Sequence, residues 1–370
     1  MKILHIVGDS KFGGGSVIIS NLVSSQISQG YDVYVLTTDE EFISHIRNIN
    51  GNVIKLECIH RNYNLFTDLL GVFRLSNYLY KNRFDFVHTH TTKAGFIGRI
   101  SAKLANCKNI IHTVHGFPFS ESSSPIKIKV FSFLEQQLFK ISDKVVFVSE
   151  YHLSWARKLK IVNQSKAVAI KNGIEIREPD NTFDILKLVS DEAAFRIVYV
   201  GRLVKEKGLL ELIEAFKLLL VNYPYLHLIL VGNGPDRVEL ERASDNCRNI
   251  HFTGFVQNAV DYLVHSNVFV LPSFREGLSI SAIEAQAYGV PSVLSDIGGN
   301  VEVSNNGADA LLFTTGSISS LSNEIKRLID DENLRQSLSE RAKLNYQKNF
   351  TNDAMVSKYA VIYNELKDLV

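Results

Sequence analysis

Two carboxylates, Glu276 and Glu284, lie eight residues apart in the stretch 267–295. If both stood on one helix, they would be about 12 Å apart along its axis. Glycosidases hold the two acids that act on one bond roughly 5–10 Å apart. The spacing therefore suits a long ligand with one carboxylate near each end. The alternative is a loop Glu beside a surface Glu with no shared ligand, and the spacing alone does not separate the two.

Two cations, Arg202 and Lys207, follow a predicted strand that begins at Ile197 and precede a predicted helix that begins at Leu209. The first N–H groups of a helix have no partner within it, so a helix N-terminus attracts phosphate. Two cations beside it would suit a diphosphate. The alternative is a pair of solvated surface charges.

Residues 8–15 form a predicted loop that ends in Gly13-Gly14-Gly15, and Ser16 is a plausible N-cap for the next helix. A glycine-rich loop between a strand and a helix is typical of phosphate sites. A dinucleotide site is the alternative, with Asp39 or Glu40 holding a ribose. The glycines do not form G-x-G-x-x-G, so this alternative has weak support.

Four histidines, His88, His90, His112 and His115, lie on or just after predicted strands. Histidines at such spacings can bind zinc, but no nearby Cys or Glu completes a ligand set. A buried, hydrogen-bonded role is the simpler interpretation for His88 and His112. His115 lies in a loop at the carboxyl end of a strand, where a ligand is expected.

The elements that must position these residues alternate between strand and helix. Short apolar runs such as Val268–Leu271 and Ser292–Leu294 predict buried parallel strands. Ligands of open α/β sheets bind at the carboxyl ends of strands. We expect an α/β fold with a Rossmann-like domain over 1–172, a linker over 173–194, a second such domain over 195–350 and a final helix over 351–370. The expected apolar face of that helix comprises Met355, Tyr359, Ile362, Tyr363 and Leu366.

Composition supports a cytoplasmic protein. The 370 residues are enough for two domains. The three cysteines have no paired spacing, which indicates reduced thiols. We expect no secretory signal, and no apolar run approaches the roughly 20 residues that a spanning helix needs.

Charge is unevenly distributed along the chain. Residues 1–172 hold 21 Lys and Arg against 12 Asp and Glu, a net +9, and the remaining 19 and 27 leave 173–370 at −8. The first half is therefore expected to face something anionic, such as nucleic acid, a membrane surface or a diphosphate-bearing lipid. Nucleic acid is disfavoured because no element interleaves aromatic and basic residues.

A predicted amphipathic helix over 125–144 lies in the basic half. Most such helices pack on their own sheet. Its lysines and extra aromatic residues also suit contact with an anionic inner-membrane surface. The candidates for that contact are Lys127, Lys129 and Lys140, beside Phe131 and Phe133.

Several motifs together resemble a known family. Glu276 to Glu284 resembles the E-x7-E motif of retaining GT-B glycosyltransferases, a family that includes sucrose synthase. Gly-Arg-Leu-x-x-x-Lys-Gly over 201–208 is similar to the donor-diphosphate motif of the same family. The run from Val87 to Phe117 resembles a narrower group that builds bacterial surface polysaccharide, including capsule and lipopolysaccharide, on undecaprenyl diphosphate. The resemblance spans almost the whole chain and also rests on Gly13-Gly14-Gly15, His115-Gly116, Lys171-Asn172-Gly173 and Gly232-Asn233-Gly234-Pro235.

The resemblance implies a GT-B architecture whose last helix crosses back to the first domain. It implies transfer of a hexose or N-acetylhexosamine from a nucleotide sugar, preferably UDP-linked, to a lipid-linked saccharide, with retained configuration. No D-x-D pair occurs in the chain, so the donor is not expected to need a metal. The resemblance implies that Arg202 and Lys207 contact the diphosphate, Glu276 and His115 the sugar, and Glu284 the ribose. The amides of Gly277, Leu278 and Ser279 would contact the sugar and the phosphate. Gly14 and Gly15 would meet the acceptor or the phosphate, Phe255 and Val256 the base, and Gly232 would line the donor pocket.

Other functions remain as alternatives at this point. An epimerase of the same shape would use a similar nucleotide-sugar site. A phosphorylase would need a lysine for pyridoxal phosphate, and none is identifiable. A non-catalytic nucleotide-binding module would bind the same ligand without turnover. Transfer from a labelled nucleotide sugar separates these readings.

Overall fold

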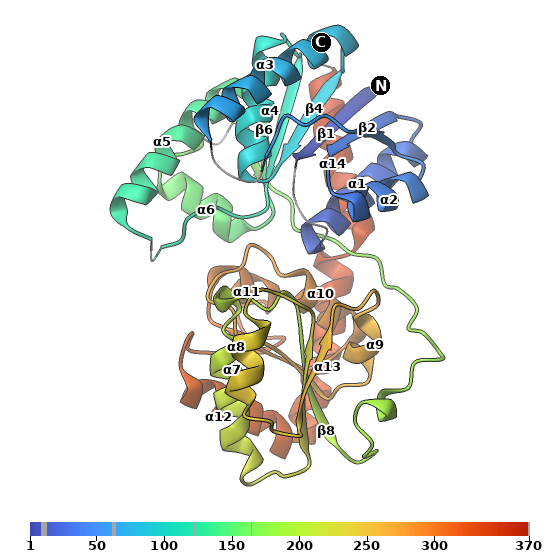
Figure 1. The fold of residues 1–370 in the computed structure, drawn as a ribbon, viewed down its shortest axis with the longest axis vertical. Coiled ribbons are helices and arrows are strands. Elements are labelled where there is room, and N and C mark those ends of the chain that lie inside the picture. Colours follow the sequence, from blue (N-terminus) through green and yellow to red (C-terminus); the bar gives the residue numbers. More distant parts are fainter. Residues whose placement is uncertain (9–12, 61–63, 122, 164, 369–370) are drawn as a thin grey trace. The chain divides into compact units, whose positions relative to one another are not determined.

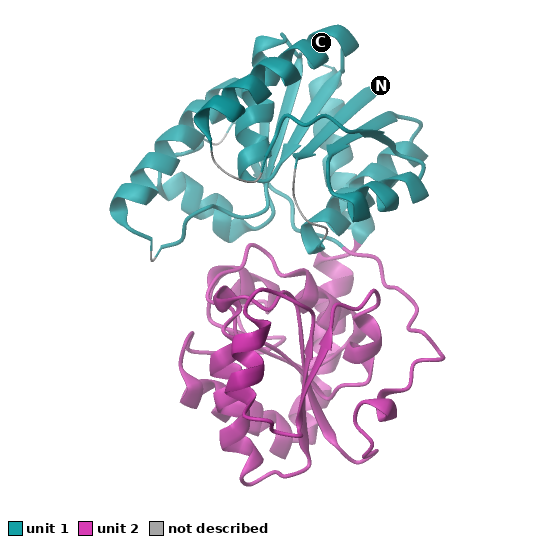
Figure 2. Ribbon diagram, in the orientation of Figure 1, with its two compact units in different colours: residues 1–173, 352–370 teal, residues 174–351 magenta. Residues whose placement is uncertain are grey.

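The computed structural model describes residues 1–8, 13–60, 64–121, 123–163 and 165–368, and it divides the chain into two compact units. Unit 1 comprises Met1–Gly173 with Asn352–Val370, and unit 2 comprises Ile174–Thr351 (Figure 2). Each unit contains its own parallel sheet, with helices on both sides. Two Rossmann-like α/β units are the architecture that the sequence predicts.

The sheet of unit 1 has seven strands in the order β3-β2-β1-β4-β5-β6-β7. The order reverses between β1 and β4, and such a reversal is where α/β sheets bind ligands, at the carboxyl ends of the strands. The strands are β1 Lys2–Gly8, β2 Asp32–Thr37, β3 Asn52–Ile54, β4 Phe86–His90, β5 Asn109–Val114, β6 Lys144–Phe147 and β7 Ala167–Ala169.

The helices of unit 1 form two groups. Helices α3, α4 and α5 pack in succession, whereas α1 contacts both α2 and α14 (Figure 1). They are α1 Gly14–Ser28, α2 Glu40–Asn48, α3 Leu65–Asn82, α4 Thr92–Leu104, α5 Pro125–Ile141, α6 Glu150–Lys158 and α14 Asn352–Lys367.

The sheet of unit 2 has six strands in the order β10-β9-β8-β11-β12-β13, with its reversal between β8 and β11. Its strands are β8 Phe195–Val200, β9 Leu226–Val231, β10 Ile250–Gly254, β11 Val268–Leu271, β12 Ser292–Ser295 and β13 Leu311–Phe313. Its helices are η1 Ile185–Lys187, η2 Lys205–Lys207, α7 Leu209–Leu220, α8 Arg237–Ser244, α9 Val260–Val264, α10 Ile280–Tyr288, α11 Gly298–Val303, α12 Ile318–Asp330 and α13 Glu332–Asn349.

The central strands are buried along their whole length because helices cover both faces of each sheet. All four residues of β11 are fully buried, and β4 and β5 are buried throughout. These rigid strands end at the sheet edges where the candidate residues lie. Burial of apolar area contributes roughly 25 cal/mol per Å², so substitutions within these strands are expected to destabilise the protein. Binding and catalytic residues are more common in the loops that follow such strands.

The last helix confirms the expected return of the chain. Helix α14 belongs to unit 1 although it follows unit 2 in sequence. The hydroxyl of Tyr363 lies 2.7 Å from Nδ1 of His88, and that of Tyr359 lies 3.1 Å from Oγ1 of Thr113. The five residues expected on its apolar face, Met355, Tyr359, Ile362, Tyr363 and Leu366, are all buried.

One local prediction in unit 1 is wrong, and the dinucleotide alternative loses its proposed ribose contacts. Ser16 is not an N-cap: α1 begins at Gly14 with the extended Gly13 before it, and Ser16 is buried in the first turn. Asp39 is not free to hold a ribose, because it caps α2 by accepting a hydrogen bond from the Phe42 amide at 2.9 Å. Glu40 pairs with Lys55 at 2.7 Å. Residues 9–12 of the predicted glycine-rich loop lie outside the described residues.

The polar segment 173–194, expected to be a linker, lies almost wholly in unit 2. The backbone N–H of Arg177 donates to the Tyr288 hydroxyl at 2.8 Å, and that hydroxyl donates to the Arg177 carbonyl at 2.6 Å. The Asp180 amide donates to Asp261 at 2.8 Å. The segment shows no sustained hydrophobic period in its sequence. Hydrogen bonds to residues of α9 and α10 fix its path instead.

Candidate active site

The reversal of the unit 2 sheet brings two loops together. One loop follows β8 and contains Arg202 and Lys207, and the other follows β11 and contains Glu276. The Phe274 amide of the second loop donates to the Glu206 carbonyl of the first at 2.8 Å. The backbones of the two loops are therefore linked directly at the edge where ligands of such sheets bind.

Lys207 and Glu276 form an ion pair in this place. Lys207 Nζ lies 2.5 Å from Glu276 Oε1, and the Ser273 hydroxyl donates to the same oxygen at 2.7 Å. The side chains are 17% and 11% exposed. The pair is thus partly withdrawn from water, where its charges act more strongly than on an open surface, yet it remains within reach of a ligand.

A glycine allows this close approach. Gly208 has φ +66°, and a Cβ there would lie 2.1 Å from the Pro272 carbonyl oxygen. No other residue adopts that φ without strain or fits that gap. Gly208 therefore lets α7 start directly against the end of β11, which fixes Lys207 two residues before the first residue of the helix, Leu209.

Arg202 lies beside this pair in sequence but its side chain is exposed. Its backbone is fixed by the buried Tyr199, whose hydroxyl donates to the Arg202 carbonyl at 2.8 Å. Burial raises the pKa of Tyr199, the Glu276 charge raises it further and the Arg202 charge opposes them. Tyr199 therefore stays neutral and positions the loop, a role that sequence analysis missed because Tyr199 looks like one more strand residue.

The start of α10 lies on the other side of Glu276. Ser279 caps the helix by accepting from the Ala282 amide at 3.4 Å. The Ser295 hydroxyl donates to the Ser273 carbonyl at 2.6 Å, and Asn300 donates to Ser295 at 3.0 Å. These buried hydrogen bonds anchor the loop that contains Gly277, Leu278 and Ser279. The three predicted residues follow Glu276 directly in sequence and lead into α10.

Glu284 lies in the middle of α10 and is partly buried. Burial raises the pKa of its carboxyl to about 7, and the positive charge of Arg177 acts in the opposite direction. A carboxyl whose pKa is strongly raised by burial at a sheet edge is a candidate for contact with a polar ligand. Glu276 lies in the loop before α10 and Glu284 lies within the helix, so the 12 Å spacing of two helical acids does not apply to this pair.

The remaining unit 2 candidates follow β9 and β10. Gly232 packs so closely on the β8 loop that a Cβ would lie 1.9 Å from the Gly201 carbonyl oxygen. Its amide donates to Gly254 at 2.9 Å, directly before Phe255. Phe255 is 64% exposed and Val256 is partly buried. An exposed aromatic ring at the sheet edge is a suitable surface for a planar base.

In unit 1, Gly14 and Gly15 form the exposed first turn of α1. A Cβ at Gly15 would meet no atom within 4 Å, so nothing in the described residues fills the space beside it. His115 lies just beyond β5 and is partly exposed. Among the described residues, the structure shows no contact between His115 and either Gly14 or Gly15.

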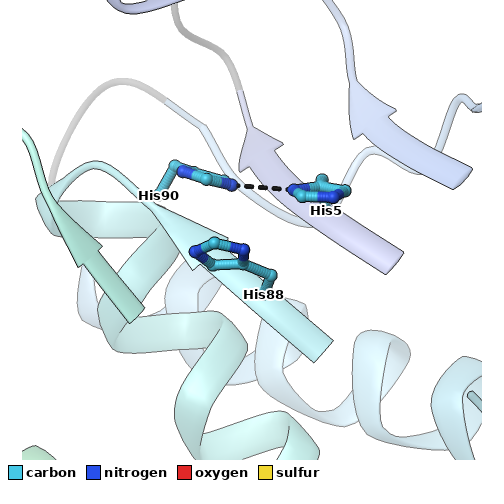
Figure 3. A group of neighbouring side chains, drawn as sticks. All are labelled: His5, His88 and His90. Atoms are coloured by element: carbon cyan, nitrogen blue, oxygen red, sulfur yellow. Dashed lines mark hydrogen bonds between the residues drawn. The ribbon is translucent and has the colours of Figure 1, made fainter. Parts of the chain in front are cut away.

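His115 is one end of a buried cluster of histidines. Its Nε2 lies 3.2 Å from His90 Nδ1. His5, His88 and His90 offer ring nitrogens within 4.8 Å of one another (Figure 3). Sequence analysis missed His5, because a single His in an apolar strand carries no signal. Only the pairing of β1 with β4 sets His5 opposite His88.

The two halves match separate family models. Residues 12–178 match Glycosyltransferase Family 4, and residues 180–345 match Glycosyl transferases group 1. An Escherichia coli protein named UDP-Gal:alpha-D-GlcNAc-diphosphoundecaprenol alpha-1,3-galactosyltransferase is 31% identical over 74% of this chain and 73% of its own. This chain belongs to the GT-B glycosyltransferases. The resemblance drawn from its motifs is thereby confirmed, and so is an enzymatic activity that transfers a sugar.

Other relatives of this glycosyltransferase cover more of its length. A Campylobacter jejuni N,N'-diacetylbacillosaminyl-diphospho-undecaprenol alpha-1,3-N-acetylgalactosaminyltransferase is 26% identical over 90% of this chain and 91% of its own. The fold matches Anabaena Alr3699/HepE in complex with UDP-glucose, with a TM-score of 0.83, 20% identity and coverage of 99% and 100%. The described residues contain no helix long and apolar enough to cross a membrane.

Proposed function

We propose that this glycosyltransferase moves a hexose or N-acetylhexosamine from a UDP-sugar to a saccharide on undecaprenyl diphosphate, with retained configuration. The single observation that carries the proposal is the Lys207–Glu276 pair at the reversal of the unit 2 sheet. It offers a cation for the diphosphate and a carboxylate for sugar hydroxyls within one site. The named relatives and the UDP complexes of the fold support this donor and acceptor.

In this proposal the charge that develops on the departing UDP is the main quantity to stabilise. Arg202, whose side chain is exposed, and Lys207 would hold the diphosphate. The amides of Gly277, Leu278 and Ser279, at the start of α10, would add donors. Such preorganised groups are worth about 10²- to 10³-fold in rate each.

The remaining contacts follow from the same placement. Glu276 would accept hydrogen bonds from the donor sugar, which would loosen its pairing with Lys207 and free that cation for phosphate. Glu284 would accept from the ribose, and Phe255 with Val256 and Gly232 would line the base and donor pocket. His115, Gly14 and Gly15 would meet the sugar, the phosphate or the acceptor. The acceptor hydroxyl would attack from the face that the UDP leaves.

We also propose that the donor needs no divalent metal. The chain lacks the D-x-D pair that would hold one, and Arg202 and Lys207 supply positive charge at the expected diphosphate position. Turnover should therefore continue in EDTA. Loss of turnover that manganese or magnesium restores would contradict this part of the proposal.

Transfer itself is tested with a panel of labelled nucleotide sugars and a short-chain polyprenyl diphosphate saccharide. We expect one UDP-sugar to give a labelled lipid product whose anomeric configuration matches that of the donor. Release of free sugar or an epimerised nucleotide sugar, without a lipid product, would favour a hydrolase or an epimerase instead.

For the acceptor, we propose that unit 1 rests on the anionic cytoplasmic surface of the inner membrane. Helices α3 and α5 expose Leu65, Phe66, Phe73, Ile126 and Phe133 at 60% or more. Several exposed large apolar side chains on one domain suggest a contact surface. Phe131 is partly buried, with its ring 6.1 Å from that of Phe119 in the core, so Phe133 is the more exposed of the two aromatic residues beside the lysines. Lys127, Lys129 and Lys140 are exposed on α5.

Vesicle binding tests this surface separately from the chemistry. Each lysine near an anionic surface contributes about 1 kcal/mol to binding. The triple change of Lys127, Lys129 and Lys140 to Glu should release the protein from anionic vesicles, with transfer to a short soluble acceptor nearly intact. Wild-type protein that ignores such vesicles, or a triple variant that still binds them, would show that α5 is an ordinary packing helix.

A further inference from the structure

Four side chains from four elements of unit 1 form one line of hydrogen bonds. Gln26 of α1 accepts at Oε1 from His5 Nε2 of β1, at 2.8 Å. His5 Nδ1 lies 2.9 Å from His90 Nε2, at the end of β4. His90 Nδ1 lies 3.2 Å from Nε2 of His115, just beyond β5. Gln26, His5 and His90 are at most 3% exposed, so water does not compete for these bonds.

The line has a direction. Burial lowers the pKa of His5 and His115 to about 4 and that of His90 well below its ordinary value, so all three rings are neutral near pH 7. A neutral imidazole has one N–H donor and one bare acceptor nitrogen. The amide oxygen of Gln26 can only accept, so His5 donates from Nε2 and accepts at Nδ1. His90 then donates to His5 and accepts from Nε2 of His115.

We propose that Gln26, His5 and His90 are positioning residues that orient His115 and hold its proton on Nε2. The Nδ1 lone pair of His115 is then left as an acceptor. That nitrogen makes no hydrogen bond within the part of the chain that the structure describes. His115 lines a small pocket with Thr91, Thr92, Gly116 and Pro118. The ring therefore presents an acceptor to a hydroxyl group that enters there.

This inference rests on the proposed function for its ligand, since a sugar hydroxyl is the donor that the Nδ1 lone pair would meet. Holding one tautomer raises the fraction of molecules that are ready to bind. It also fixes the ring plane through a second partner, as in sites where a carboxylate or carbonyl orients a working histidine. Gln26 lies in α1, the helix that begins with Gly14 and Gly15.

A metal ion held by His5, His88 and His90 is the rival explanation for this cluster (Figure 3). Every ring nitrogen of the three already has a hydrogen-bond partner: His88 contacts Tyr363 at 2.7 Å and Thr113 at 2.8 Å, and the other two belong to the line. A cation would displace a hydrogen bond at each ligand atom. We therefore favour the relay and make bound metal an outcome of the test.

The test reads the tautomer of His115 directly. The full chain, labelled with 15N at histidine, is compared as wild type, Gln26→Met, His90→Asn and His88→Asn, with His115→Gln to assign the signal. Gln26→Met keeps the volume of the side chain and removes the amide whose oxygen accepts from His5, three hydrogen bonds away from His115. His88→Asn is the matched control, because His88 is equally buried and stacks on His90 but is outside the line.

We expect wild-type His115 to show a protonated Nε2 and a bare Nδ1, and Gln26→Met and His90→Asn to mix the two tautomers. His88→Asn should leave the His115 signal unchanged. With an active donor, Gln26→Met should lower kcat/KM about three- to tenfold, as expected for one lost hydrogen bond, and His88→Asn less than twofold. A protonated Nδ1 in the wild type, a His115 signal indifferent to Gln26→Met, or stoichiometric metal in the isolated protein would each overturn the proposal. Because the tautomer is read without substrate, failure to find a donor would leave this result standing.

Discussion

The two units prepare their candidate residues in opposite electrostatic states. In unit 2, a lysine and a carboxylate face each other at the mouth of the site, each still partly exposed. In unit 1, the polar residues behind His115 are neutral, buried and joined by hydrogen bonds. The difference matches two kinds of ligand group. Charged groups at a half-open edge suit a diphosphate, whereas a fixed neutral imidazole suits a hydroxyl.

The two units should also differ in how much stability they lose when a polar partner is removed. A buried polar network is stable only while every member has its partner. An ion pair at an edge tolerates the loss of its partner better, because water can reach it. Unit 1 should therefore be sensitive to changes that charge or orphan a histidine. Unit 2 should be sensitive in catalysis more than in stability.

Acidification should produce the largest difference in stability between the two units. Burial lowers the pKa of His5 and His115 to about 4 and that of His88, His90 and His112 well below the usual value. Between about pH 6.5 and 4 the unfolded chain thus binds protons that the native state does not. The stability of unit 1 is full above about pH 6.5 and falls with pH through this window, by several kcal/mol in total.

This effect has a local probe. Trp155, the single tryptophan, is buried in unit 1 against Phe117 and Phe119. Its fluorescence and the hydrogen exchange of β1 and β4 should report loss of structure at pH 5 before β8 and β11 lose protection. If unit 2 opens first, or both open together, the histidines do not control acid stability.

Next in size is Lys207→Ala, which removes the cation of the unit 2 site. We expect turnover to fall by about a hundredfold or more, which corresponds to about 2.7 kcal/mol of barrier. The matched control is Lys205→Ala: Lys205 lies in the same turn, is 72% exposed and pairs with the half-exposed Glu239 at 3.4 Å. Equal turnover in the two folded variants would remove Lys207 from the donor site.

A smaller effect is expected for Tyr363→Phe, which removes one hydroxyl of α14. His88 Nδ1 would lose its partner at 2.7 Å and stay buried, which costs about 2 kcal/mol. Urea unfolding followed by Trp155 fluorescence measures the change in unit 1. Tyr80→Phe, on the exposed face of α3, is the control and should change nothing. A neutral result for both would mean that α14 packs on unit 1 without satisfying the network.

Sequence reasoning reached the fold because strand and helix periods are local properties. It found Lys207 and Glu276 separately, but their pairing depends on β8 lying beside β11, which are not consecutive strands. The same holds for His5, which meets His88 only through the register of β1 and β4. Its errors have a local cause too. Ser16 and Asp39 are both good caps by type. The extended Gly13 precedes α1 in place of Ser16, whereas Asp39 does cap a helix, a role that its type alone could have indicated.

The smallest predicted effect concerns Glu284, whose pH dependence should oppose that of the histidines. Burial raises the pKa of its carboxyl to about 7, against about 4.3 in an unfolded chain. Between these values the native state holds a proton that the unfolded state has lost. Stability therefore falls as pH rises through this window and is flat above it.

Glu284→Gln removes this titrating carboxyl from unit 2 and leaves the histidines of unit 1 unchanged. The variant should match the wild type at pH 5 and exceed it by about 1 kcal/mol at pH 8, a modest gain because solvent screens a partly exposed carboxylate. A ribose that donates hydrogen bonds to Glu284 would favour the ionised form. UDP should therefore bind the wild type less tightly below pH 7 and bind the variant roughly tenfold less tightly at pH 8, since a hydrogen bond to a charged group is worth about 1.5 kcal/mol or more. Calorimetric titration of UDP at pH 6 and 8 measures both. Affinity that does not change with pH in the wild type would place the ribose elsewhere, while a stability gain at pH 8 would still identify Glu284 as the group that titrates.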